Sequence, residues 1–406
     1  PSQLFPTKIT SRSPLAALPP LSPSSSHQFH QLADAGKGNK KATMTSSVKA
    51  LWRRFACVAC RFARTASSTR LCWRCRSSSR AFDSASSSRR RSHSTAETVV
   101  VGGGAVGTGI AYHLARAGWS EVMLLERDEL TSGSTWHAAG LLPLFNMGYA
   151  TSHIHDYSVK FYKTLEAETG LNAGFAVVGN LRMAQTQARM DEYMLYASTA
   201  ESVGIPYEWL TPAQIKARWP LVRSEDLKGA IFHPTDGYIN PADVTQAMAK
   251  GARQRGAVIA ERTKATGVTA DGDRITQVHW QAEDGTSGSI EADHVVNCAG
   301  MWGREGGRML GVNVPLQACE HFYIVSEPIP GLQPLPVLRV PDECAYYKED
   351  AGKLMLGAFE PVAKPWGLAG IPDSFEYDQL PEDFDHFEPI LEMAVTRMPA
   401  LTEAGI

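Results

Sequence analysis

The chain has 406 residues, of which 43% are hydrophobic and 20% charged, a composition typical of globular proteins. This length is enough for two packed domains, since single hydrophobic cores stop growing at roughly 250–300 residues. No run of 18 or more apolar residues occurs, so no membrane span is expected.

Charge is distributed unevenly along the chain. Residues 1–95 hold 17 of the 40 Lys and Arg but only 2 of the 42 Asp and Glu, so residues 96–406 carry a net charge of −17 with neutral His. A body this acidic is not expected to bind nucleic acid through its phosphates. The basic segment is therefore expected to have a separate role.

The first 95 residues are predicted to be a disordered N-terminal leader. Residues 1–43 begin with Pro1, are rich in Pro and Ser and show no period. We interpret them as disordered, or as sequence upstream of a natural product that starts at Met44. Residues 44–95 are rich in Arg and Ser, with Asp83 as the only acid, which predicts a mitochondrial transit peptide removed after import.

Cysteines fall into two groups. Two closely spaced pairs in the leader have the spacing of a four-thiolate zinc site, but the spacer between the pairs is short and no strand pattern accompanies it. No metal site is predicted, and zinc binding there is left open: Cys57, Cys60, Cys72 and Cys75. The other three cysteines lie in apolar contexts and are predicted to be reduced core thiols: Cys298, Cys319 and Cys344.

Residues 98–107, TVVVGGGAVG, predict a strand followed by a tight glycine turn. Gly102, Gly104 and Gly107 have the GxGxxG spacing of a dinucleotide-binding turn. The first glycine permits the turn, the second lets the backbone approach a pyrophosphate, and the third lets the next helix pack against the strand. That helix is predicted to end at Gly118, and its N-terminal N–H groups would face the phosphates.

A helix and a second strand follow the glycine turn in the order of a βαβ unit. Ile110, Leu114 and Ala117 keep helical spacing, and residues 120–126, SEVMLLE, predict a buried strand that ends at Glu126. Glu126 is expected to accept hydrogen bonds from a ribose diol, and its charge disfavours the 2′-phosphate of NADP. The unit therefore predicts a dinucleotide site, although the glycine spacing does not separate FAD from NAD.

Residues 127–140, RDELTSGSTWHAAG, indicate FAD rather than NAD, because they resemble a segment of a known family. Here the chain resembles the FAD-dependent dimethylglycine and sarcosine dehydrogenases, amine oxidoreductases related to D-amino-acid oxidase. The resemblance covers roughly residues 96–406. It includes FHPTDGYINP at 232–241, VVNCAGMWG at 295–303, PLQACEHFYIV at 315–325 and LPEDFDHFEPIL at 380–391.

The resemblance implies an α/β fold, in which a Rossmann-like FAD-binding domain is interleaved with an α+β substrate domain built on an antiparallel sheet. We expect the FAD-binding domain over residues 96–170 and 240–311 and the substrate domain over 171–239 and 312–406. The relatives continue past the residue that matches Ile406, so the substrate domain is expected to be truncated. Without that further region, flavin binding is expected to be weak or absent, and any tetrahydrofolate binding is expected to depend on the missing region.

In this family the histidine of the TWH motif carries the flavin through a covalent bond to its 8α-methyl group, and His137 is the matching residue. A neutral imidazole has the nucleophilicity that such a bond requires. The alternative, that His137 caps a turn or donates to a phosphate, stays open. Besides the three glycines and Glu126, the resemblance implies these cofactor contacts: Arg127, Ser134, Thr135, Ala299, Gly300 and Trp302.

The family's substrates are small N-methylated amino acids of the sarcosine or dimethylglycine type. The resemblance implies hydride transfer from the N-methyl carbon to the flavin, with the electrons passing to an electron-transfer flavoprotein in the mitochondrial matrix. His321 and Tyr323 match a His-x-Tyr that faces the flavin and are the catalytic candidates, although strand packing also explains such a pair.

Three residues are candidates for binding the substrate carboxylate, for which a planar guanidinium is best suited: Arg339, Tyr347 and Lys348. His233 and Asp236 are predicted to form a turn rather than to act in catalysis.

Two alternative functions remain. A mitochondrial regulatory subunit of pyruvate dehydrogenase phosphatase, not known as a catalyst, also resembles the chain at ACEHFY and EDFDHFEP. That relative lacks histidine at the position of His137, which favours an enzyme here. An NAD-dependent dehydrogenase would need a nicotinamide site, which the sequence does not indicate, and fold alone does not decide between these functions.

Overall fold

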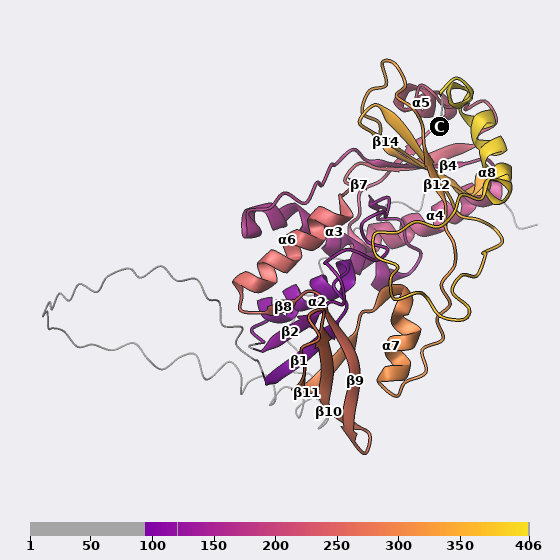
Figure 1. The fold of residues 1–406 in the computed structure, drawn as a ribbon. Coiled ribbons are helices and arrows are strands. Elements are labelled where there is room, and N and C mark those ends of the chain that lie inside the picture. The colour runs from indigo at the N-terminus through magenta and orange to yellow at the C-terminus, as the bar shows by residue number, and fades with distance from the viewer. Residues whose placement is uncertain (1–93, 120, 405–406) are drawn as a thin grey trace, which may run out of the picture. The chain divides into compact units, whose positions relative to one another are not determined.

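Two β-sheets organise the residues that the structure, a computed structural model, describes: 94–119 and 121–404 (Figure 1). The predictions made for residues 1–93, including a zinc site at the four leader cysteines, lie outside the described residues. The described part of the chain contains no helix that is both long and apolar enough to cross a bilayer.

The first sheet forms around the predicted glycine turn, in the order β8-β2-β1-β11-β10-β9. Its first four strands are parallel, and β10 and β9 extend it as antiparallel neighbours. Val99 and Val100 of β1 are fully buried, as expected for a parallel strand covered on both faces. The strands are β1 (Thr95–Val101), β2 (Val122–Leu125), β8 (Val258–Ala260), β9 (Thr263–Asp271), β10 (Arg274–Ala282) and β11 (Ser287–Asn297).

Helices α2, α3 and α6 share a hydrophobic core with β1 and β2 (Figure 1). Asn240 caps α6 by accepting hydrogen bonds from two backbone N–H groups, as the sequence predicts, and Gly118 follows α2 with a φ of +91°. These helices are α2 (Ala105–Arg116), α3 (Tyr149–Thr169) and α6 (Pro241–Gln254).

The second sheet has seven strands in the order β12-β15-β14-β13-β4-β6-β5. All neighbours are antiparallel except β13 and β4, which are parallel, so the prediction of a purely antiparallel sheet is wrong at this pair. The strands are β4 (Asn180–Ala184), β5 (Glu208–Leu210), β6 (Gly229–His233), β12 (Tyr323–Val325), β13 (Val337–Val340), β14 (Ala345–Asp350) and β15 (Lys353–Ala358).

The two faces of the second sheet have different surroundings. One face, with Leu338 and Tyr347, packs against α5 and α8 through Ile215 and Phe387. The other face is partly covered by α4, and the rest of it borders a cavity. These helices are α4 (Gln187–Val203), α5 (Pro212–Arg218) and α8 (Phe384–Arg397).

Short elements complete the described fold. A two-stranded ribbon joins β3 (Leu141–Leu142) and β7 (Gly237–Tyr238), and α7 (Gly303–Met309) follows a 3₁₀ turn at Gly300–Trp302. Two further 3₁₀ turns cover Pro341–Glu343 and Pro399–Thr402.

The two sheets take their strands from alternating stretches of chain. The first uses residues 95–125 and 258–297, and the second uses 180–233 and 323–358. The α/β class is therefore confirmed. The division into two domains at the predicted boundaries stays a prediction, because all described residues fall in one compact unit.

Candidate active site

The glycine turn between β1 and α2 is too tight for side chains. Gly102 has a φ of +112°, and its N–H donates to the carbonyl of Leu125 at 2.9 Å. A Cβ on Gly107 would come within 1.9 Å of the Gly102 carbonyl oxygen. Glycine is thus required at both positions for the turn and for the approach of the helix to the strand.

Around this turn, polar groups are arranged for a nucleotide. The partly buried Glu126 carboxylate accepts hydrogen bonds from the N–H groups of Gly103 and Asp128, and its burial raises its pKa. Gly104 begins α2 without a side-chain cap, and only the N–H of Ala105 finds a side-chain acceptor, Thr135 Oγ1 at 3.2 Å. The open helix N-terminus suits the phosphates of a dinucleotide.

His137 lies in the loop that follows β2. The start of this loop contacts the glycine turn, where the Thr131 N–H donates a hydrogen bond to the Gly103 carbonyl at 3.3 Å. The ring of His137 is half-buried beside Trp136, with 4.7 Å between ring centroids, and forms no hydrogen bond with any described residue. Burial lowers the pKa of His137, so the ring is neutral at pH 7. The loop therefore presents an unpaired, uncharged imidazole.

A cavity of about 1050 Å³ is lined by strands of the second sheet and by loops that follow strands of the first. This size suits a small-molecule or cofactor site, and its walls combine aromatic rings with a few polar groups. The sequence-predicted site residues that line it are Ser134, His137, Gly300, His321, Tyr323 and Arg339.

Other predicted residues lie elsewhere. Arg127 stacks over the ring of Trp302 at 4.4 Å and pairs with Asp128 at 2.8 Å. Lys348 pairs with Asp350 at 3.0 Å and does not line the cavity. Tyr347 is fully buried on the opposite face of β14, against Trp219. The structure therefore does not bring Tyr347 or Lys348 to the site.

Residues paired across five strands form one row along the cavity face. Tyr323 pairs with Gly357, Gly357 with Tyr346, Tyr346 with Arg339, and Arg339 with Arg182. A Cβ on Gly357 would lie 1.8 Å from the ring of Tyr346, so this ring lies directly over the glycine. Sequence reasoning missed Arg182 and Tyr346. The signal for Arg182 is a charged residue between apolar neighbours in the strand NLRMA.

Glu360 is a further residue that sequence reasoning missed. Its side chain is only 6% exposed, and its Oε2 lies 2.9 Å from Nδ1 of His321, while Oε1 accepts from the N–H of Phe322 at 2.9 Å. Burial opposes charge on Glu360, but these hydrogen bonds outweigh burial and hold its pKa below the ordinary value. Glu360 thus fixes the orientation of His321.

His233 and Asp236 lie behind the cavity and are fully buried. His233 Nε2 is 3.0 Å from the hydroxyl of Tyr196, and Asp236 Oδ2 accepts from the N–H of Leu144 at 2.9 Å. Burial lowers the pKa of His233 to about 3 and raises the pKa of Asp236 to about 8, so both are neutral at pH 7. They flank the turn between β6 and β7, where the sequence predicts a turn.

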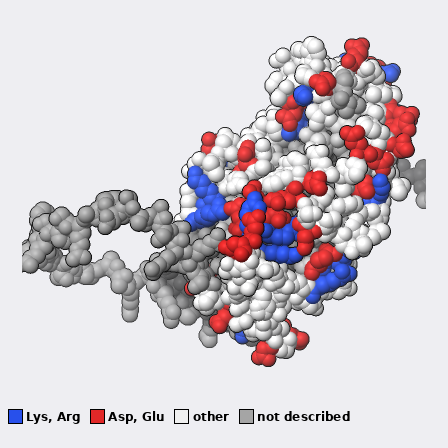
Figure 2. Space-filling view, in the orientation of Figure 1, with Lys and Arg blue, Asp and Glu red and all other residues white. Residues whose placement is uncertain are grey.

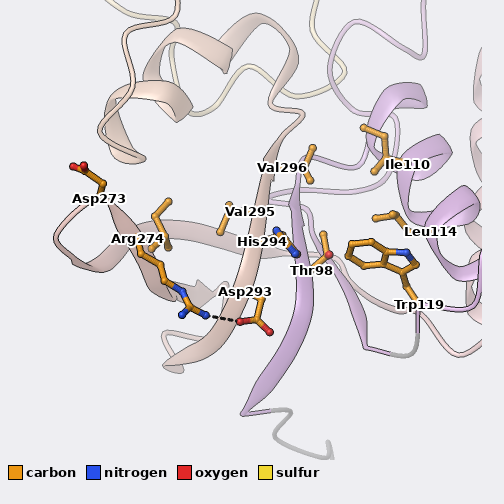
Figure 3. Close-up of a pocket in the computed structure, with 11 residues that line it drawn as sticks. Thr98, Ile110, Leu114, Trp119, Asp273, Arg274, Asp293, His294, Val295 and Val296 are labelled. Carbon is orange, nitrogen blue, oxygen red and sulfur yellow. Dashed lines mark hydrogen bonds and ion pairs between the residues drawn. The ribbon is translucent and has the colours of Figure 1, made fainter. Parts of the chain in front are cut away.

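A second cavity of about 580 Å³ lies beside β11 (Figure 3). Ile110, Leu114 and Trp119 line one side of it, and its charged residues include Arg274 and Asp293, which pair with each other at 2.7 Å. The one buried polar side-chain atom there without a partner is the hydroxyl of Thr98. This cavity brings together few groups that could do chemistry, so the larger cavity is the candidate active site.

Neither a metal site nor a disulfide is found among the described residues. No group of three or more His, Cys, Asp or Glu could hold a metal ion there, and the described cysteines are free thiols. Cys298 and Cys344 are partly buried, whereas Cys319 is exposed, so the prediction that all three are core thiols is wrong for Cys319.

On the face drawn in Figure 2, basic side chains lie in small groups bordered by acidic ones. The largest of these mixed groups crosses the middle of the drawn face, and wide areas around it carry neither kind of charge.

The glycine turn, the open helix end and the adjoining cavity fit a bound dinucleotide. The indole N–H groups of Trp136 and Trp302, on the two loops beside this region, are buried without a partner and are available to a bound group. Fold and site together define a dinucleotide-binding protein of the α/β class.

Comparison with known proteins gives the family. The model of the FAD dependent oxidoreductase family matches residues 97–406, and the chain belongs to this family. It is 36% identical over 320 residues to mitochondrial dimethylglycine dehydrogenase of Mus musculus, covering 77% of this chain and 36% of the relative. It is also 37% identical over 310 residues to the mitochondrial pyruvate dehydrogenase phosphatase regulatory subunit of Mus musculus, covering 75% and 35%.

Among solved structures, L-proline dehydrogenase from P. horikoshii has the same fold, with a TM-score of 0.67 and 24% identity over 77% of this chain and 80% of that one. The chain spans about a third of the length of the dimethylglycine dehydrogenase and of the phosphatase regulatory subunit. The chain is therefore related to proteins named for the dehydrogenation of dimethylglycine and sarcosine.

Proposed function

We propose that the protein removes the N-methyl group of a small amino acid of the sarcosine or dimethylglycine type by oxidation. The observation that carries this proposal is the shared cavity: neutral His137 faces the same space as His321, Tyr323 and Arg339. The likeness to dimethylglycine dehydrogenase supports the substrate class.

In this proposal each residue has a separate task. Arg339 pairs with the substrate carboxylate, and a guanidinium fits that planar group in two hydrogen bonds. His321, oriented by Glu360, and Tyr323 hold the amine and keep its nitrogen unprotonated, because an ammonium cannot assist cleavage of the neighbouring C–H bond. Bound FAD supplies the acceptor for the two electrons of that bond.

His137 would hold the flavin covalently. Its neutral, unpaired imidazole and the small neighbours Ala138 and Ala139 in the same cavity wall support this role. After acid precipitation of the purified full chain, flavin should stay with the yellow pellet. The variant H137A should release it to the supernatant, whereas H294A, a histidine beside the second cavity, should behave like the wild type.

Flavin in the wild-type supernatant would contradict the covalent bond. The activity itself is tested by formaldehyde release from sarcosine and dimethylglycine with an artificial electron acceptor. Absence of formaldehyde from flavin-loaded protein would overturn the proposed reaction.

Partners and location belong to the same proposal. The names of the relatives and the composition of residues 44–95 support a mitochondrial location, in the matrix. The electron acceptor would then be an electron-transfer flavoprotein, and capture of the carbon by tetrahydrofolate would depend on a further C-terminal region.

A second candidate function is a non-catalytic regulatory subunit, favoured by the 37% identity to the phosphatase subunit. Protein that purifies without flavin and binds none on addition of FAD would favour this candidate.

A further inference from the structure

Two arginines stand side by side in the larger cavity without a carboxylate to neutralise them. Arg182 of β4 and Arg339 of β13 pair across neighbouring parallel strands, and both line the cavity. Neither guanidinium forms an ion pair with a described Asp or Glu, and the Nε atom of each is buried without a hydrogen-bond partner.

Different aromatic rings hold the two guanidinium groups. That of Arg339 lies over Phe359 at 3.8 Å, and Phe359 contacts His321 with 5.6 Å between ring centroids. That of Arg182 lies over Phe145 at 4.0 Å, in a separate aromatic cluster around α4. Each guanidinium therefore has its own aromatic support in the cavity wall.

Asn180 adds a third unpaired polar group beside Arg182. The two residues are separated by one position on β4, so they share a face of the sheet. Asn180 is fully buried, lines the cavity, and has no partner for either its amide oxygen or its amide nitrogen. A buried amide is costly unless a ligand pairs with it.

Neither arginine forms an ion pair with a described acid, although Tyr193 and the charge of Glu192 partly offset the effect of burial on the pKa of Arg182. Burial and the charge of Arg182 lower the pKa of Arg339 to about 10, and burial lowers the pKa of Arg182. The buried Asp236 is neutral at pH 7, because burial raises its pKa to about 8. The acids that line the cavity pair with neither arginine: Asp378, Glu382 and Asp383.

We propose that the substrate carries a second carboxylate, so that the cavity binds a dianionic N-alkyl amino acid. The first carboxylate pairs with Arg339, on the side of His321, and the second pairs with Arg182 and Asn180. This inference rests on the proposed oxidation of a small N-alkyl amino acid and replaces its substrate class, because sarcosine and dimethylglycine carry one carboxylate each.

Unreactive ethers test the inference on the full chain without any turnover. Methoxyacetate carries one carboxylate, whereas diglycolate and 2-methoxysuccinate carry two, and all three keep an ether oxygen where the amine would lie. Calorimetry at constant ionic strength should show at least one dianion binding about tenfold more tightly than methoxyacetate, as a second charge-assisted pair implies.

The variant R182M should remove the preference for the dianion and leave methoxyacetate affinity within about threefold, since methionine keeps the stacking over Phe145. The matched control is R218M. Arg218 also stacks over a phenylalanine of the second sheet, Phe232 at 4.1 Å, but pairs with Glu208 outside the cavity. This control should keep the preference.

Equal affinity of the wild type for mono- and dianions overturns the inference, and this comparison decides even if R182M misfolds. Equal weakening of all three ligands in folded R182M overturns it too. Methoxyacetate binding without a preference for the dianions would leave the proposed function intact and overturn only the second carboxylate. Failure of all three ethers to bind would contradict both the proposed function and the further inference.

Discussion

At the scale of single residues, the site depends on polar groups that burial has made neutral or left unpaired. His137 lacks a partner and a charge, and His233 and Asp236 are buried in their neutral forms. A buried group that resists ionisation makes the free energy of unfolding depend on pH.

Asp236 and His233 should act on stability in opposite directions. The pKa of Asp236 is about 8 in the folded state against 3.8, so its contribution is full below pH 3.8 and is lost as pH rises through 8. The pKa of His233 is about 3 against 6.5, so its contribution is full above pH 6.5 and is lost as pH falls through 3. Between pH 3.8 and 6.5 the effects of the two groups on the pH dependence of the unfolding free energy cancel.

The variant D236N should therefore gain stability relative to the wild type as pH rises. Asparagine can still accept from the N–H of Leu144, and the difference in unfolding free energy should grow by about 1.4 kcal/mol per pH unit from pH 5 to 8. Urea unfolding at several pH values measures it. In H233Q the difference from the wild type should change only below pH 6.5, where it should grow as pH falls, which is the opposite direction to D236N. A D236N difference that stays constant with pH would show that Asp236 ionises in the fold.

At the scale of elements, a close contact between strands β14 and β15 of the second sheet positions one aromatic ring of the site. Gly357 of β15 leaves space for the Tyr346 ring of β14, which lies between Tyr323 and Arg339 in the row of paired residues. In G357A the methyl group should push this ring into the cavity. We expect methoxyacetate affinity to fall at least about tenfold, a loss of about 1.4 kcal/mol.

The control for that variant is G267A. Gly267 lies in β9 of the first sheet, where an added Cβ would come no closer than 3.6 Å to another atom. G267A should bind methoxyacetate like the wild type. Unchanged binding by folded G357A would show that the position of Tyr346 does not shape the site.

Helix α8 is anchored to the second sheet by one buried arginine. Arg397 is 4% exposed and pairs with Glu343 at 2.6 Å and Asp226 at 2.7 Å. Replacing it by methionine leaves the buried Glu343 without its positively charged partner, with only the amide of Gln185 still donating to it, which should cost about 3–5 kcal/mol in urea unfolding. R253M breaks the exposed pair of Arg253 with Glu261 and should cost at most about 1 kcal/mol. Equal losses would argue against a buried anchor.

Local pattern explains which elements the sequence predicts well. The βαβ unit and the capped helix α6 follow from apolar periodicity, glycine spacing and Asn240. Helix α4 has its apolar residues spread around the helix, so no period marks it, and the parallel pairing of β4 with β13 joins segments more than 150 residues apart. Neither is visible in a local window of sequence.

The same limit applies to the site. His137 and the glycines stand in a continuous motif, whereas Arg182 and Tyr346 reach the cavity only through strand pairing. The sequence names Tyr347 as a candidate, and the structure brings its neighbour Tyr346 to the cavity instead. Successive residues of a strand point to opposite faces, so an error of one position in phase exchanges a cavity residue for a core residue.

At the scale of the whole molecule, the cavity makes the two sheets depend on each other. His137 and Gly300 stand on loops that follow strands of the first sheet, and Arg182, Tyr323 and Arg339 stand on the second. A flavin and substrate analogue bound between them would contact both sets, and binding at 100 times the Kd would stabilise the folded state by about 2.7 kcal/mol.

Hydrogen exchange should reveal this coupling. On addition of FAD with methoxyacetate, backbone protection should rise in residues 131–140 and 298–302 and also in β4, β12 and β13, because opening either wall then requires loss of the ligands. The β9–β10 hairpin, which borders the second cavity, should keep its exchange rates. Protection limited to the first sheet would mean that the nucleotide binds at the glycine turn without contacting the second sheet. That result would contradict the proposal that the shared cavity is the active site.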